Sequence, residues 1–274
     1  MTLKNRNSFI KVFLLSSLIL FLFMLATLIY SIATKNILVP PAIRLPDFFD
    51  HIPFLRNSFL AVMLSFSIIF IYIPISFFLL IKYFENTQTS EIIFFTGFLI
   101  ACMAESARFL SICLGLWQSF SDILIFAGKV VLFGRTLAPL SFLCAALFSE
   151  TSQRQDVERN YIIMMTASVV FAAIIPMNTA RIASTGLVTE GFMVLINIFR
   201  LLLFVTTTLS FLVLGIKKNS LEHKHLASSS FLLILGYSMI VSCDTFVFLI
   251  LGTAGLSFGT YRYLYFIHKM YMWS

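Results

Sequence analysis

The chain has 274 residues, of which 59% are apolar and only 11% are charged, and phenylalanine alone accounts for 32 of them. Soluble domains are about 45–50% apolar and about 25% charged, and a fold of this length leaves too much surface in water to hide so many apolar side chains. This composition excludes a water-soluble fold, a disordered chain and a disulfide-rich domain. It predicts a polytopic membrane protein.

Seven apolar runs reach the length of about 20 residues that a spanning helix needs. They cover residues 10–33, 57–82, 91–116, 121–149, 160–181, 187–216 and 227–252 approximately. A further segment, about 255–273, is shorter and more polar, and we expect either a short interfacial helix or a full eighth span there. The chain is therefore expected to be an all-α transmembrane bundle that forms one integral membrane domain over residues 1–274.

The first run begins with basic residues, as a secretory signal does. Its apolar stretch exceeds 20 residues, whereas the apolar core of a signal peptide has about 7–15. We therefore expect the run to be retained as the first span.

The net charge of +7 does not indicate nucleic-acid binding, because the basic residues are spread over short connections and not gathered on one face. With the N-terminus in the cytoplasm, the inner segments hold nine basic residues and the outer segments hold four. Cytoplasmic loops are rich in Lys and Arg, so this count predicts a cytoplasmic N-terminus and insertion in the inner (cytoplasmic) membrane. The nine are Lys4, Arg6, Lys11, Lys82, Arg154, Arg159, Lys217, Lys218 and Lys224, and the four are Lys35, Arg44, Arg56 and Arg181.

Six charged residues lie inside the apolar runs, where each costs about 2.5–3.5 kcal/mol to insert and is a functional candidate. Glu105, Arg135 and Arg200 fall near the middle of the membrane, and a second set (Arg108, Lys129 and Asp244) falls about eight residues from the outer end. Glu105 and Arg135 lie at one depth on consecutive antiparallel helices. We therefore expect them to form a buried ion pair, and we expect Asp244 to neutralise one of the remaining bases.

The four bases outnumber the two acids, which leaves about two positive charges inside the bundle. One interpretation is an outward-facing cavity in which Arg200, Arg108 and Lys129 bind a small anionic ligand, namely a carboxylate, a phosphate or a lipid headgroup. The other is an internal lattice of ion pairs, with Lys129 extending its ammonium to the interface.

Motifs for catalysis and cofactors are missing from the sequence. There is no HExxH and no GxSxG, and none of the four histidines lies between residues 52 and 222, so no buried pair is available for haem. The four cysteines (Cys102, Cys113, Cys144 and Cys243) lie in apolar runs without CxxC spacing and are expected to be buried thiols. We predict no catalytic residue, no metal site and no cofactor.

The fourth run and its exit read FAGKVVLFGRTLAPLSFLCAALFSETSQ, and the next run ends in IIPMNT. This basic-then-Gly-then-Pro helix with a short polar turn resembles the seven-helix sensor regions found N-terminal to some bacterial histidine kinases and diguanylate cyclases. The resemblance covers residues 57–252 approximately and implies ligand sensing within the bundle. Those proteins carry a cytoplasmic output domain, so a signal from this chain is expected to pass to a partner protein or to a domain outside it.

The favoured hypothesis is thus a membrane sensor or receptor that binds a small anionic or lipidic ligand, contacts membrane lipids and acts through a cytoplasmic signalling partner. The alternative is a transporter or the membrane subunit of a transport system with an ATPase partner. Many transporters have broken helices at matching places in two halves, but Gly134 and Pro139 have no clear counterpart in the second half of this sequence.

Overall fold

The computed structural model describes residues 3–34, 37, 57–87, 89–115, 122–149, 156–183, 185–186 and 188–272. The helices are α1 (Leu3–Ala33), α3 (Phe59–Phe84), α4 (Ser90–Ala104), α5 (Ser106–Cys113), α6 (Asp122–Phe148), α7 (Val157–Ile174), α8 (Met193–Lys217), α9 (Leu221–Val241) and α10 (Phe246–Met272). The strands β1 (Met177–Ile182) and β2 (Val188–Glu190) pair in an antiparallel hairpin. The expected all-α bundle is confirmed, with this hairpin as a small addition.

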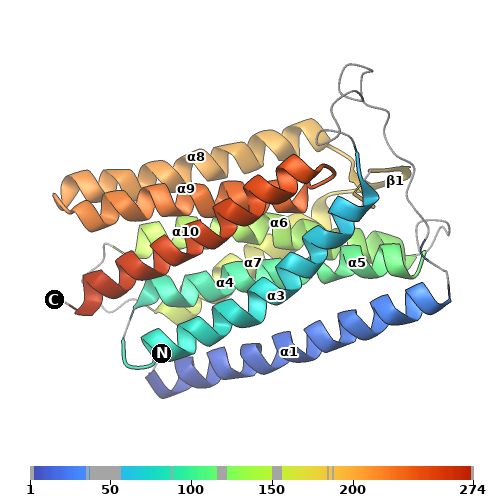
Figure 1. The fold of residues 1–274 in the computed structure, drawn as a ribbon. Coiled ribbons are helices and arrows are strands. Elements are labelled where there is room, and N and C mark those ends of the chain that lie inside the picture. The colour runs from blue at the N-terminus through green and yellow to red at the C-terminus, as the bar shows by residue number, and fades with distance from the viewer. Residues whose placement is uncertain are drawn as a thin grey trace.

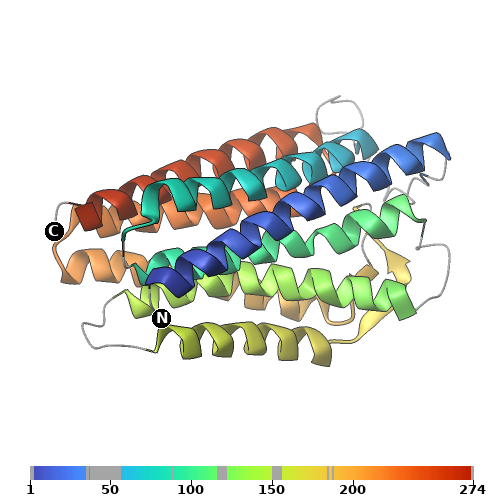
Figure 2. The same cartoon turned by 90° about the horizontal axis from the view of Figure 1, so that it is seen from below.

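The long helices run side by side along one direction, and the hairpin lies at the end opposite to the start of α1 (Figure 1). Within the described residues, seven segments are long and apolar enough to cross a membrane, namely α1, α3, α4 with α5, α6, α7, α8 and α9. Large apolar side chains are exposed along α1 and α8, and α7 lies at the edge of the bundle (Figure 2). These surfaces suit contact with lipid. The number, length and composition of the helices therefore indicate a multi-pass membrane protein.

The expected fifth and sixth runs extend too far into the connection between them. The fifth was expected to reach residue 181, but α7 ends at Ile174 and β1 follows. Pro176 explains this end, because proline has no N–H to donate and restricts the residue before it to extended conformations. The sixth was expected to start at 187, but β2 occupies residues 188–190 and α8 starts at Met193.

The expected seventh run, 227–252, is wrong because it crosses a helix boundary. Helix α9 ends at Val241, and α10 starts at Phe246. The hydroxyl of Thr245 accepts a hydrogen bond from the backbone N–H of Phe248 at 3.4 Å, which is the contact of a helix N-cap. The last helix is therefore longer than the expected segment 255–273. It has 27 residues and runs along the bundle (Figure 1).

Glycines let two pairs of helices approach closely. On α9, a Cβ added to Gly236 would lie 2.4 Å from the backbone nitrogen of Leu256 on α10. On α6, a Cβ added to Gly134 would lie 2.7 Å from the carbonyl oxygen of Ala101 on α4. Small residues at such crossings are a common means of packing helices in membranes. The α4–α6 crossing brings the end of α4 against the middle of α6, where the charged residues lie.

Polar contacts join the helix ends at which α1 starts and α10 finishes. Arg6 of α1 donates to the carbonyl oxygens of Phe84 at 2.5 Å and Glu85 at 3.2 Å, at the end of α3. Near the end of α10, the Tyr271 hydroxyl lies 3.0 Å from each carboxylate oxygen of Glu91, at the start of α4. Helix α10 thus finishes at the end of the bundle where α1 begins (Figure 1).

Candidate anion-binding site

The carboxylate of Glu105 is shared by two arginines. Glu105 occupies the turn between α4 and α5, and both it and Arg108 are fully buried. Its Oε2 lies 3.0 Å from Nε of Arg108, and its Oε1 lies 3.3 Å from Nε of Arg135 on α6. The structure thus brings Glu105 and Arg135 together as the sequence predicted, and it adds Arg108 to the same carboxylate.

A helix end supplies a second acceptor to both guanidinium groups. The carbonyl oxygen of Val241, the last residue of α9, accepts hydrogen bonds from Arg108 and, at 3.3 Å, from Arg135. The last carbonyls of a helix lack partners within the helix and carry its negative pole. The Arg108 guanidinium also lies over the ring of Phe66, 4.4 Å from its centroid. Arg108 is therefore held by protein groups on several sides.

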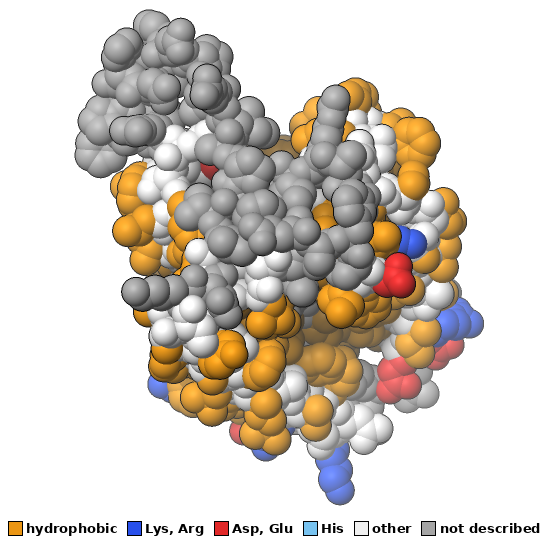
Figure 3. Space-filling model, turned by 90° about the vertical axis from the view of Figure 1, so that its right-hand side faces the viewer, with side chains coloured by type: hydrophobic (Ala, Val, Ile, Leu, Met, Phe, Trp, Pro, Cys, Tyr) orange, Lys and Arg blue, Asp and Glu red, His pale blue; other side chains and the backbone are white. Residues whose placement is uncertain are grey.

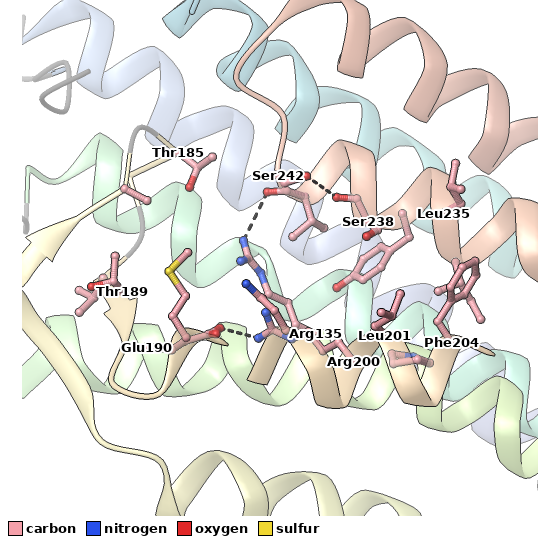
Figure 4. A pocket seen from close by; sticks show the side chains of 18 residues that line it. Arg135, Thr185, Thr189, Glu190, Arg200, Leu201, Phe204, Leu235, Ser238 and Ser242 are labelled. Carbon is pink, nitrogen blue, oxygen red and sulfur yellow. Dashed lines mark hydrogen bonds and ion pairs between the residues drawn. The ribbon is translucent and has the colours of Figure 1, made fainter. Parts of the chain in front are cut away.

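A cavity of about 520 Å³ lies between α6, α8, α9 and the hairpin. The side chains of Arg135 and Arg200 reach into it next to each other, as Figure 4 shows. The end of the molecule that carries the hairpin is hollowed near its centre, between hydrophobic side chains (Figure 3). The other polar residues that line the cavity are Thr185, Thr189, Glu190, Asn197, Tyr237, Ser238 and Ser242.

Arg200 has a carboxylate partner that the sequence analysis did not expect. Its guanidinium forms an ion pair and hydrogen bond with Glu190, the last residue of β2 (Figure 4). In a continuous helix over 187–216, these residues would stand ten positions and about 15 Å apart. The chain instead turns at Gly191, whose N–H donates to the carbonyl of Pro176 at 2.9 Å, and the hairpin holds Glu190 against α8. The count of two acids for four bases inside the bundle did not include Glu190 and is corrected to that extent.

One positive charge is still in excess in this cluster. Glu105 and Glu190 supply two carboxylates for the guanidinium groups of Arg108, Arg135 and Arg200. Among the described residues, the buried side-chain donors without a hydrogen-bond partner include Nε of Arg200 and the hydroxyl of Tyr237, which line the cavity, and Nη2 of Arg108, which does not. A buried donor without a partner costs about 1–3 kcal/mol. Positive charge and unsatisfied donors therefore meet beside one cavity.

The structure places the other expected site residues away from this cavity. Lys129 donates to the carbonyl oxygen of Ala173 at 2.9 Å, beside the end of α7. Asp244 lies in the connection between α9 and α10, where its backbone carbonyl accepts from the N–H of Ser58 at 2.8 Å. Arg108 lies on the far side of Glu105 and does not line the cavity. Arg200 thus lines the cavity together with Arg135, and not together with Arg108 and Lys129 as expected.

Two residues of the cavity, Glu190 of the hairpin and Tyr237 of α9, were not expected from the sequence. Glu190 lies ten residues before Arg200 and Tyr237 lies on a different helix, yet both line the same cavity as Arg135 and Arg200. Pro176 and Gly191 were the available signals, because both residue types commonly end helices or make turns.

A second cavity of about 640 Å³ lies between α3 and α10 and has a different chemistry. Its lining is mostly aliphatic and tyrosine side chains, with His268 at one end and no guanidinium or carboxylate among the described residues. The hydroxyls of Tyr72 and Thr260 in it are 2.6 Å apart and satisfy each other. The charged cavity is therefore the stronger candidate for recognition of an anion.

The part of the chain that the structure describes contains no cluster of three or more His, Cys, Asp or Glu side chains that could hold a metal ion. Cys102, Cys113 and Cys243 are buried free thiols, and Cys144 is half-buried.

Comparison of the chain with protein-family models, with curated proteins and with solved structures finds no match.

Proposed function

We propose that this protein is a membrane sensor or receptor that binds a small anionic ligand in the cavity between α6, α8, α9 and the hairpin. The observation that carries the proposal is that Arg135 and Arg200 line one cavity, within a cluster that has one more guanidinium than carboxylate. Guanidinium groups bind carboxylates and phosphates through paired hydrogen bonds. The volume of about 520 Å³ lies within the usual range of about 300–1,000 Å³ for small-molecule sites.

The proposal includes an orientation with the N-terminus in the cytoplasm and insertion in the inner membrane. Many basic residues lie at the end of the bundle where α1 begins, including Lys4, Lys82, Lys217, Lys218 and Lys269. The positive-inside rule places such an end in the cytoplasm. The hairpin and the cavity then face outward, and a signalling partner binds at the opposite, cytoplasmic end.

Similarity to the seven-helix sensor regions of histidine kinases and diguanylate cyclases supports the same proposal. Helices α3 to α10 include the 57–252 region in which the sequence resembles those proteins. In this scheme, ligand binding between α6, α8 and α9 changes the positions of the helix ends on the cytoplasmic side.

A transporter is the second candidate, because one helix is interrupted beside the cavity. Helices α4 and α5 are separated by a turn at Glu105, and Pro139 of α6 lines the cavity. Interrupted helices near the membrane midplane are common at transporter binding sites. Uptake of a bound anion by sealed proteoliposomes would favour the transporter, and binding without uptake would favour the receptor.

Native mass spectrometry of the purified protein tests the proposed site. We expect an anion to co-purify with the wild type, to be lost from Arg200→Met and to be reduced in Arg200→Lys, which keeps the charge but not the paired donors. Lys129→Met is the matched control, because it removes a cation that does not line the cavity. Retention of the anion at the wild-type level in both Arg200 variants would reject the site.

A further inference from the structure

The lining of the cavity changes from polar to apolar along its length. On α6, Arg135 is followed one turn later by Pro139, and on α8, Arg200 is followed by Leu201 and then Phe204. Helix α9 runs in the opposite direction, and along it the apolar Ile234 and Leu235 come first and the polar Ser238 and Ser242 follow. Along all three helices the lining thus changes from polar to apolar at one level, with the polar half beside the hairpin (Figure 4).

The apolar half also has a defined end. The rings of Phe204 on α8 and Phe231 on α9 pack with their centroids 4.9 Å apart, beyond the two arginines. Arg200 and Phe204 are one helical turn apart, which is a rise of about 6 Å. The apolar part is therefore long enough for a short aliphatic chain.

We infer that the ligand is an amphiphile with a singly charged anionic head, a carboxylate or a phosphodiester, and a short apolar tail. This inference rests on the proposed function and names the class of ligand. The single charge follows from the excess of one guanidinium in the cluster, since a dianion would leave a net negative charge buried. The tail follows from the apolar walls of Leu201, Phe204, Ile234 and Leu235. The head is bound by Arg135 and Arg200, and the Tyr237 hydroxyl donates to it.

A homologous series of carboxylates tests the inference. Acetate, butanoate, hexanoate and octanoate are titrated into the protein in nanodiscs of phosphatidylcholine, and the dissociation constants are measured by calorimetry. We expect the affinity to rise about fourfold for each added methylene, the factor for transfer of one CH₂ out of water. The rise should level off after about four to six carbons, where the tail reaches Phe204 one turn from Arg200.

Phe204→Ser removes the apolar end of the cavity and should flatten the dependence of affinity on chain length, so that hexanoate binds little better than acetate. Leu209→Ser is the matched control, because Leu209 is on the same helix, is 54% exposed and does not line the cavity. Longer carboxylates partition into lipid equally in both variants, so the difference between them reports the cavity.

The outcomes separate this inference from the proposed function. Equal affinities for acetate and hexanoate, both lost in Arg200→Met, would keep the anion site and reject the amphiphile. Absence of binding by every carboxylate would reject the inference, and absence of any co-purified anion as well would reject the proposed function.

A final arm identifies the source of the amphiphile. Nanodiscs of phosphatidylcholine and phosphatidylglycerol in equal parts present a phosphodiester head that carries two long acyl chains. Unchanged hexanoate binding in them would support the inference with a free short-chain amphiphile as the occupant, and weaker binding in them would show that a long-chain lipid enters the site, which would overturn the short tail.

Discussion

Glu105 neutralises two buried guanidinium groups, because its carboxylate forms ion pairs with both Arg108 and Arg135. In Glu105→Gln, Arg108 would remain fully buried without a carboxylate. Loss of one partner of a buried pair costs roughly 3–5 kcal/mol, whereas replacement of both partners is often nearly neutral. We therefore expect Glu105→Gln to lower the thermal unfolding temperature in detergent, and Glu105→Gln/Arg108→Met to recover much of the loss. Additive losses in the double variant would contradict the shared ion pair.

Glu190 competes with an anionic ligand for Arg200, since its carboxylate already binds that guanidinium. Glu190→Gln removes the negative charge and should strengthen hexanoate binding on the order of tenfold, which is about 1.4 kcal/mol. This is well below the Coulomb energy of about 4 kcal/mol for two charges 4 Å apart at an effective dielectric constant of 20. Calorimetry of the variant beside the wild type measures the change. Glu222→Gln is the control, because Glu222 lies at the start of α9, far along that helix from the cavity. Weaker binding in Glu190→Gln would indicate that Glu190 orients Arg200 and does not compete with the ligand.

At the scale of the elements, the close crossing of α9 and α10 depends on glycines. An added Cβ at Gly236 would lie 2.4–3.0 Å from three backbone atoms of α10, and backbone cannot move aside as a flexible side chain can. We expect Gly236→Ala to destabilise the protein by about 1–3 kcal/mol, the usual cost of overpacking, which thermal unfolding in detergent would detect.

Gly128 on α6 provides the comparison for that prediction. The three atoms nearest to an added Cβ there all belong to the side chain of Met177, at 3.4 Å or more. Gly128→Ala should therefore unfold at the wild-type temperature or slightly above, because alanine favours the helix. Equal effects of the two substitutions would show that the α9–α10 crossing is not tightly packed.

At the scale of the whole molecule, α1 begins and α10 finishes at one end of the bundle (Figure 1). With the orientation proposed above, both ends face the cytoplasm. In a cysteine-free background, Ser8→Cys and Lys269→Cys should resist a membrane-impermeant maleimide in intact cells, and Thr34→Cys at the far end of α1 should react. Lysed cells provide the control, since all three cysteines should then be labelled. Reaction of Ser8→Cys but not Thr34→Cys in intact cells would reverse the orientation, and opposite results for Ser8→Cys and Lys269→Cys would show that α10 does not cross.

Composition and length determined the helical bundle and most of its spans. A segment that crosses lipid must satisfy its own backbone hydrogen bonds, so an apolar run of about 20 residues has few alternatives to a helix. Depth along consecutive helices also determined that Glu105 and Arg135 meet, because antiparallel neighbours place equal depths side by side.

Only the tertiary structure decided the hairpin, the break between α9 and α10, and the partner of Arg200. Both sides of residues 242–245 are apolar, so composition does not reveal the helix end that Thr245 caps. The hairpin folds Glu190 back onto α8, which makes a neighbour of a residue that would be about 15 Å away along a helix. The cavity is lined by α6 and by three elements that follow one another later in the chain, namely the hairpin, α8 and α9. Its charge and shape therefore depend on how those elements pack, which no single segment of the chain encodes.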